Sequence, residues 1–115
     1  MSVSSKYQRL ISALLDATEE RRIKWETTSV SNEYQTVINK NMLSVRCFPS
    51  YDSFGNCSNK PGYALHLKNK AGEIIDTYYG GSSYTRNEPE YLYDAARRSY
   101  FKVEETIDDM VSNLV

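Results

Sequence analysis

The chain has 115 residues, with 14 basic and 15 acidic side chains and a formal net charge of −1. A chain of this length is expected to fold as one domain, residues 1–115, with a core that needs no disulfide or metal. The balanced charge excludes a global field that would attract nucleic acid or an anionic membrane, so neither is expected as a partner.

The cysteine content and the absence of long apolar runs predict a cytoplasmic protein. No apolar stretch approaches the ~20 residues that span a bilayer, and residues 1–20 lack the pattern of a signal peptide. Cys47 and Cys57 are expected to stay reduced there. With His66 they supply too few ligands for structural zinc, so we expect no metal and no cofactor.

The first predicted element is an amphipathic helix over residues 4–22. Its apolar residues recur at helical spacing, and Arg21 and Arg22 near its end would complement the helix dipole. Ile23 and Trp25 then alternate as in a strand or an extended link. Trp25 is expected to close the core beneath the helix.

Two hairpins follow. Residues 34–38 and 43–47 alternate in polarity on either side of Asn39-Lys40-Asn41, where asparagine tolerates the positive φ of a tight turn. Residues 63–79 alternate in the same way around a turn at 69–72, in which Gly72 would supply the left-handed residue.

A loop rich in Ser, Asn, Gly and Pro separates the hairpins, at about residues 49–62. A loop of this length is either functional or mobile. Its aromatic residues, Tyr51 and Phe54, either contact a partner or fold back to hold the loop on the sheet.

The period changes to helical after Tyr79. Asn87 and Glu90 resemble a capping box around Pro89, which predicts a helix to about Tyr100. A second amphipathic helix follows, with its apolar residues at Val103, Ile107, Met110, Val111 and Leu114.

These elements predict a single two-layer α+β domain of order α-β-β-β-β-α-α. Its sheet would be a four-stranded antiparallel meander, with helices from both ends of the chain covering one face. The open face would carry the polar residues of the strands, namely Gln35, Arg46, His66, Lys68 and Thr77.

The sequence favours a protein that is not an enzyme. His66 and Lys68 point to the same face of one strand and would suit a general base beside a cation, but a lone strand histidine is more typical of a surface residue. No other catalytic motif is present, and the cysteines lack one that would mark a nucleophile.

A second candidate site is the segment Gly80-Gly81-Ser82-Ser83, which lies after a strand and before a helix. Backbone amides and hydroxyls in such a loop can hold an anion, although neither phosphate-loop pattern is matched. The alternative interpretation is a turn. As a ligand site it would combine Gly80, Gly81, Ser82 and Ser83 with the basic residues Arg46, His66 and Lys68.

Ten tyrosines stand out in the composition, several of them around the predicted helix at 87–100. Adjacent arginines, Arg97 and Arg98, diverge by about 100° on that helix. One would pair with Asp94 or the last helix and leave the other free. The composition is typical of a protein-binding surface or of a cation–π cluster in the fold. The partner-binding candidates are Tyr51, Phe54, Tyr84, Tyr91, Tyr93, Arg97 and Arg98.

Three segments, "LLDATEERRIKWE", "YALHLKNKAGEIIDTYY" and "LYDAARRSYFKVEETIDDM", together resemble a group of small uncharacterised bacterial and phage α+β proteins. The shared pattern is a helix before I-x-W-E, a strand pair and an L-Y-x-x-A-R-R-S helix near the C-terminus. The resemblance covers most of the chain and implies a fold but no activity. Its pattern positions are Trp25, Glu26, Leu92, Tyr93, Arg97 and Arg98.

We therefore expect a small protein-binding module, of an inhibitor, immunity or accessory type, in bacteria–phage conflict. The partner would be another protein, and a homodimer through the C-terminal helix is left open. The alternative is a binder of a small anionic ligand, such as a nucleotide, at Gly80–Ser83 and nearby basic residues.

Overall fold

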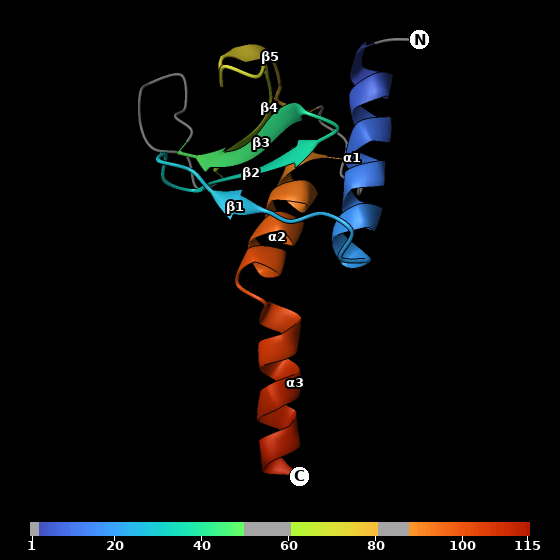
Figure 1. Cartoon of the computed structure of the whole chain (residues 1–115), viewed down its shortest axis with the longest axis vertical. Helices are drawn as coiled ribbons and strands as arrows, with labels where there is room; N and C mark the ends of the chain where they lie inside the picture. The colour runs from blue at the N-terminus through green and yellow to red at the C-terminus, as the bar shows by residue number, and fades with distance from the viewer. Residues whose placement is uncertain (1–2, 50–60, 81–87) are drawn as a thin grey trace.

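The computed structural model describes residues 3–49, 61–80 and 88–115. Helices α1 and α2 lie against one face of a sheet of five strands, and α3 extends away from this body (Figure 1). In chain order the elements are α1 (Val3–Glu19), β1 (Glu26–Thr27), β2 (Glu33–Ile38), β3 (Asn41–Phe48), β4 (Gly62–Lys68), β5 (Ile74–Tyr78), α2 (Pro89–Tyr100) and α3 (Val103–Leu114).

The strands form an antiparallel meander of order β1-β2-β3-β4-β5, which confirms the predicted α+β class. The sheet has one strand more than the four expected. This strand, β1, has only two residues, which pair with Gln35 and Tyr34 of β2. Two residues are too few to show an alternating pattern, so the sequence left a strand and an extended link open here.

Both predicted hairpin turns are confirmed. Asn39 and Lys40 have positive φ angles of 51° and 70°, which is the requirement of a type I′ turn. In the second turn Gly72 has a φ of 86°. The side-chain oxygen of Asn69 accepts hydrogen bonds of 3.0 Å from the backbone N–H groups of Ala71 and Glu73. The polar side chain thus fixes the turn that joins β4 to β5.

Helix α1 ends earlier than predicted. It stops at Glu19, and Arg21 takes a left-handed conformation with a φ of 59°. The backbone N–H groups of Arg21 and Arg22 donate to the carbonyls of Thr18 and Ala17. This is the hydrogen-bond pattern of a Schellman motif. Both arginines therefore follow the helix instead of forming its last turn.

Helix α2 begins one residue later than the proposed capping box requires. Its N-cap is Glu88, with an extended backbone (φ −111°, ψ 153°) and no side-chain capping bond, so the prediction of Asn87 as the cap is wrong. A residue before proline is held in the extended region, which places the first helical residue at Pro89. Asn87 itself lies outside the described residues.

The core lies between the sheet and the helices α1 and α2. Trp25, which was predicted to close the core, is 2% exposed. Its Nε1 donates to Thr18 Oγ1 at 2.9 Å, and Thr18 in turn donates to the Leu14 carbonyl at 2.7 Å. The largest fully buried apolar side chains include Ile11, Leu14, Trp25, Val45, Leu65 and Leu92.

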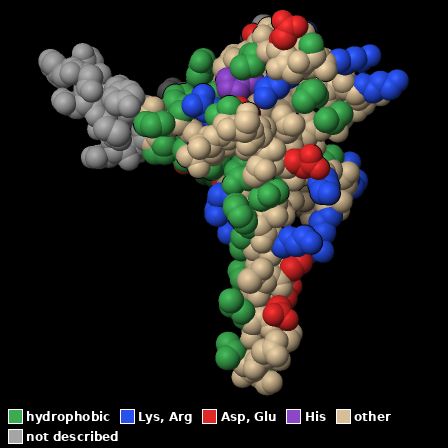
Figure 2. All heavy atoms as spheres, turned by 60° about the vertical axis from the view of Figure 1, so that its left-hand side comes forward, with side chains coloured by type: hydrophobic (Ala, Val, Ile, Leu, Met, Phe, Trp, Pro, Cys, Tyr) green, Lys and Arg blue, Asp and Glu red, His purple; other side chains and the backbone are tan. Residues whose placement is uncertain are grey.

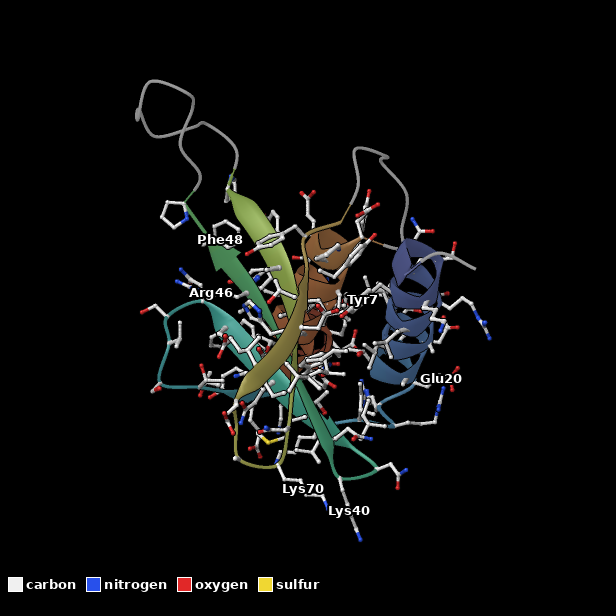
Figure 3. All side chains as sticks on the ribbon, turned by 90° about the horizontal axis from the view of Figure 1, so that it is seen from above. Tyr7, Glu20, Lys40, Arg46, Phe48 and Lys70 are labelled. Atoms are coloured by element: carbon white, nitrogen blue, oxygen red, sulfur yellow. The ribbon has the colours of Figure 1, made fainter. Side chains whose placement is uncertain are left out.

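Tyr7 connects α1 to the outer strand β5. In Figure 3 its side chain lies between α1 and the sheet. Its ring stacks on that of Tyr78 with centroids 4.6 Å apart, and its hydroxyl donates to Asp76. Burial, then the hydrogen bond to Asp76 and its charge, raise the pKa of Tyr7 to about 12. The first helix therefore holds the last strand of the sheet in place.

Helix α3 extends away from the sheet. None of its residues is buried. Of the other helices and strands, α2 is the one with which it makes substantial contacts. It continues below the end of α2 after a break at Phe101 and Lys102 (Figure 1). Lys102 has a φ of 53°, a left-handed conformation that interrupts the helix.

Candidate functional site

The first unusual surface is the apolar side of α3, which we call the α3 stripe: Val103, Ile107, Met110, Val111 and Leu114. On a helix these positions fall within an arc of about 100°. Met110 is 60% exposed and Leu114 84% exposed. Figure 2 shows hydrophobic side chains in a row along this helix. The stripe that the sequence predicted is present, and from Ile107 onward its side chains are exposed.

Two ion pairs fix the start of α3 against the rest of the molecule. Arg21, after α1, pairs with Glu105 at 2.7 Å, and Arg98 of α2 pairs with Glu104. The pair with Glu104 raises the pKa of Arg98. These side chains border a cavity of about 360 Å³ between the three helices, which also touches Leu15 and Tyr91. The cavity thus belongs to the joint that orients α3.

The second unusual surface lies on the sheet face turned away from α1 and α2. Strand register places Glu33 opposite Arg46, and Ser44 opposite His66, which is itself opposite Thr77. Directly opposed residues of antiparallel strands share a face. With Lys68 these side chains form what we call the polar face cluster: Glu33, Ser44, Arg46, His66, Lys68 and Thr77.

Several members of the polar face cluster are buried. Ser44 is 0% exposed, Glu33 5% and His66 8%, so the expectation that His66 is a surface residue is wrong. Lys68 Nζ lies 3.4 Å from Glu33 Oε1. Lys68 is on β4 and Glu33 on β2, so this ion pair crosses β3, the strand that contains Ser44. In Figure 2 a histidine is visible between lysine or arginine side chains on this side of the molecule.

His66 is held in its neutral form. Its Nδ1 lies 2.9 Å from Thr77 Oγ1. Burial lowers the pKa of His66, and the positive charges of Lys68 and Arg46 lower it further, while the carboxylate of Glu33 opposes them. At neutral pH the imidazole therefore carries one N–H donor and no charge.

Two buried polar atoms of the polar face cluster, Ser44 Oγ and Arg46 Nε, have no hydrogen-bond partner among the described residues. The carboxylate directly opposite Arg46, that of Glu33, is paired with Lys68 instead. The cluster then contains two permanent cations and one carboxylate. Buried donors without partners are uncommon because each costs about 1–3 kcal/mol. Glu33 and Ser44 were not named as site residues from the sequence. Each lies two positions before a residue predicted on the open face, Gln35 or Arg46, and therefore on the same face as His66.

Tyr93 and Tyr100 of α2 form an aromatic cluster with Tyr34 and Tyr63 of the sheet. Tyr34 lies 5.6 Å from Tyr93 and 5.7 Å from Tyr100, measured between ring centroids. Tyr63 also lies 5.6 Å from Tyr93, and burial, with Cys47 and Glu90 as lesser causes, raises its pKa to about 12. Of the predicted partner-binding tyrosines, Tyr93 packs in this cluster.

Tyr91 is the described tyrosine of α2 that faces outward most, with 49% exposure, and it borders the cavity between the helices. The prediction that one of the two arginines is free is wrong. Arg97 lies 3.4 Å from Asp94, and Arg98 pairs with Glu104. Arg97 thus pairs with a carboxylate one turn earlier in α2, and Arg98 with one at the start of α3.

The remaining predicted residues separate into two groups. Tyr51, Phe54, Gly81, Ser82, Ser83, Tyr84 and Cys57 lie outside the described residues. Gly80 has a φ of 84°, and a side chain there would collide with Glu88 and Pro89. Gly80 thus allows β5 to approach the start of α2. Cys47 is a free, half-buried thiol.

Across the ranges 3–49, 61–80 and 88–115, no group of His, Cys, Asp or Glu side chains is arranged to hold a metal. In the same ranges no helix is long and apolar enough to cross a bilayer.

Comparison of the chain with known protein families, with curated proteins and with solved structures finds no match in any of the three.

Proposed function

We propose that this chain is a protein-binding module and that α3 is its docking helix. The observation that carries the proposal is the α3 stripe, an amphipathic helix side on which Ile107, Met110, Val111 and Leu114 are exposed. A contiguous apolar patch with a polar border is typical of a binding surface. An amphipathic helix that presents such a stripe suits insertion into an apolar groove.

The ion pairs at the start of α3 support this function. Arg21–Glu105 and Arg98–Glu104 hold the helix in one direction relative to α1 and α2. A helix that is already formed and oriented loses less conformational entropy on binding. The cavity at this joint is a consequence of the same arrangement.

The charge of α3 indicates the chemistry of the partner. The helix contains four acidic residues and no basic one. Glu104 and Glu105 pair with arginines of the same chain, whereas Asp108 and Asp109 form no ion pair with the described residues. The partner we propose therefore has an apolar groove bordered by lysine or arginine. A second copy would bring two acidic helices together.

The resemblance to small bacterial and phage proteins favours an inhibitor, immunity or accessory role for such a module. A protein of this kind would act by blocking a groove on its partner, and this function requires no catalytic group.

The test compares two substitutions that add the same charge on opposite sides of α3. Met110→Asp places a carboxylate in the α3 stripe, and Ser112→Asp places one about 160° away around the helix. Used as baits in lysate from the source organism, the wild-type chain and S112D should retain the same protein, and M110D should lose it by about tenfold or more. Raising the salt concentration should weaken the retained complex.

Two results would contradict the proposal. One is an identical set of retained proteins for all three baits. The other is a concentration-dependent dimer of the wild-type chain in light scattering that M110D abolishes, because the stripe would then be covered by a second copy. Met110 is 60% exposed, so M110D should change the free energy of unfolding by less than about 0.5 kcal/mol.

A further inference from the structure

We propose that the polar face cluster binds the carboxylate group of a ligand, with Arg46, Ser44 and His66 as its donors. This site lies on the opposite side of the sheet from the helices and does not depend on the proposed role of α3. It differs from the anion site predicted at Gly80–Ser83, since its donors come from the middle of β3 and β4.

The unpaired donors are the first support. Ser44 is 0% exposed and its Oγ has no hydrogen-bond partner, and the buried Nε of Arg46 has none either. The two residues lie two positions apart on β3, so their side chains leave the same face of the strand. Both donors therefore lie on one face of the strand, and each is covered by neighbouring side chains that a bound group would have to displace.

The pairing of Glu33 is the second support. Glu33 lies directly opposite Arg46 in the register, where an ion pair would be expected. Its carboxylate instead lies 3.4 Å from Lys68, with side chains only 5% and 12% exposed. The protein thus supplies a carboxylate for Lys68 and none for Arg46 among the described residues.

His66 adds a neutral donor. If Thr77 donates its hydroxyl proton to Nδ1, the histidine proton resides on Nε2. His66 lies directly opposite Ser44, so that N–H, the serine hydroxyl and the guanidinium lie on the same face of two neighbouring strands. The Nε of Arg46 and one of its terminal nitrogens form the fork that matches the two oxygens of a carboxylate.

The charge of the cluster selects the class of anion. Arg46 and Lys68 are positive, Glu33 is negative and His66 is neutral, which leaves one uncompensated positive charge. A carboxylate monoanion neutralises it. A phosphate group near −2 would leave a net negative charge beside Glu33, at a cost in a poorly solvated site.

The experiment titrates the full chain with acetate and with N-acetylalanine at constant ionic strength, followed by the NMR signals of the Ser44 amide and the Arg46 Nε–H. Inorganic phosphate and sulfate are the comparison anions. The variants are Arg46→Met and Ser44→Ala. Lys40→Gln and Lys70→Gln are matched controls, since each removes one positive charge at an exposed hairpin turn away from Arg46 (Figure 3).

We expect saturable shifts at Ser44 and Arg46 with either carboxylate, in the wild type and in both control variants. R46M should weaken binding by about tenfold or more, as the loss of a charge-assisted hydrogen bond does, and S44A by less. S44A keeps the charge and the strand, so it tests the site even if R46M unfolds.

Three results would overturn the proposal. They are shifts that do not saturate, equal binding by S44A and the wild type, and tighter binding of phosphate than of either carboxylate. The first would show only screening by salt, and the last would show a site for a different anion. M110D changes none of these residues, so loss of partner binding and loss of carboxylate binding can be observed independently.

Discussion

Among single residues, Thr18 and Trp25 show how this fold satisfies a buried polar group. Thr18 Oγ1 donates to Leu14 and accepts from Trp25 Nε1, so both side chains are bonded in the core. Ser44, equally buried, has no such partner. The hydrogen bonds of Thr18 and Trp25 stabilise the fold, whereas the hydroxyl of Ser44 remains without such a bond among the described residues.

The Thr18–Trp25 bond can be measured by a double-mutant cycle. Trp25→Phe and Thr18→Ala should each lower the free energy of unfolding by about 1–3 kcal/mol, since each leaves a buried group unbonded or creates a small cavity. In urea unfolding the double variant should lose about 1 kcal/mol less than the sum. Strict additivity would show that the bond contributes nothing.

His66 should make the protein less stable in mild acid. Its folded-state pKa is lowered from 6.5 by burial, so folding favours the neutral form. That contribution is complete above pH 6.5 and is lost as the pH falls below 6.5 and through the folded-state pKa. Between pH 7 and pH 5, a range set by the ordinary histidine pKa of about 6.5, the free energy of unfolding should fall more steeply for the wild type than for His66→Gln. Parallel curves would contradict the burial of this histidine.

Among the elements, the two hairpin turns reach positive φ by different residues. The first uses Asn39 and Lys40, and the second uses Gly72. A left-handed conformation costs a non-glycine residue about 1–2 kcal/mol, and glycine avoids this cost.

Removing the glycine from the second turn and introducing one into the first should therefore change the stability of the protein in opposite directions. Gly72→Ala should destabilise the protein by about 1 kcal/mol through backbone conformation alone, since no atom lies within 4 Å of the added Cβ. Lys40→Gly should stabilise it by about 0.5 kcal/mol, after the greater entropy of glycine in the unfolded chain is subtracted. Thermal unfolding of both variants tests the pair, and a shift of the same sign in both would refute the interpretation.

Most of the elements were predictable because their periodicity is local. The alternation around Asn39 and Gly72 gave both hairpins, and the apolar spacing gave all three helices. Helix ends were less predictable, since Arg21 enters a left-handed conformation without a glycine and Pro89 displaces the cap.

The candidate sites were predictable only in part. Arg46, His66 and Lys68 were expected on one face, but the burial of His66 depends on how neighbouring strands and the Lys68–Glu33 pair close over it. The α3 stripe was visible in the sequence. What it packs on depends on the direction of a helix after Lys102, which no local pattern encodes.

At the scale of the whole molecule, α3 stands outside the cooperative core. None of its side chains is buried, and two ion pairs connect its start to Arg21 and Arg98. Exposed ion pairs contribute about 0–1 kcal/mol each. The stability of the domain should therefore rest on the sheet with α1 and α2.

Removal of residues 103–115 tests this division. The shortened chain should keep its fold and lose less than about 2 kcal/mol in urea unfolding, with the loss confined to the two ion pairs. The Arg21→Gln variant of the full chain, which removes one of the pairs, serves as the reference. A loss of more than about 4 kcal/mol would show that α3 is part of the core after all.

The bond between Tyr7 and Asp76 joins residues 69 positions apart, whereas every strand of the meander pairs only with its neighbour in sequence. The hairpins can thus form early during folding, because they close short loops, while α1 must wait for β5 and α2 before it has a surface to cover. During synthesis the first helix is made long before its partners. Until they follow, its apolar side, with Ile11 and Leu14, remains exposed and open to chaperones.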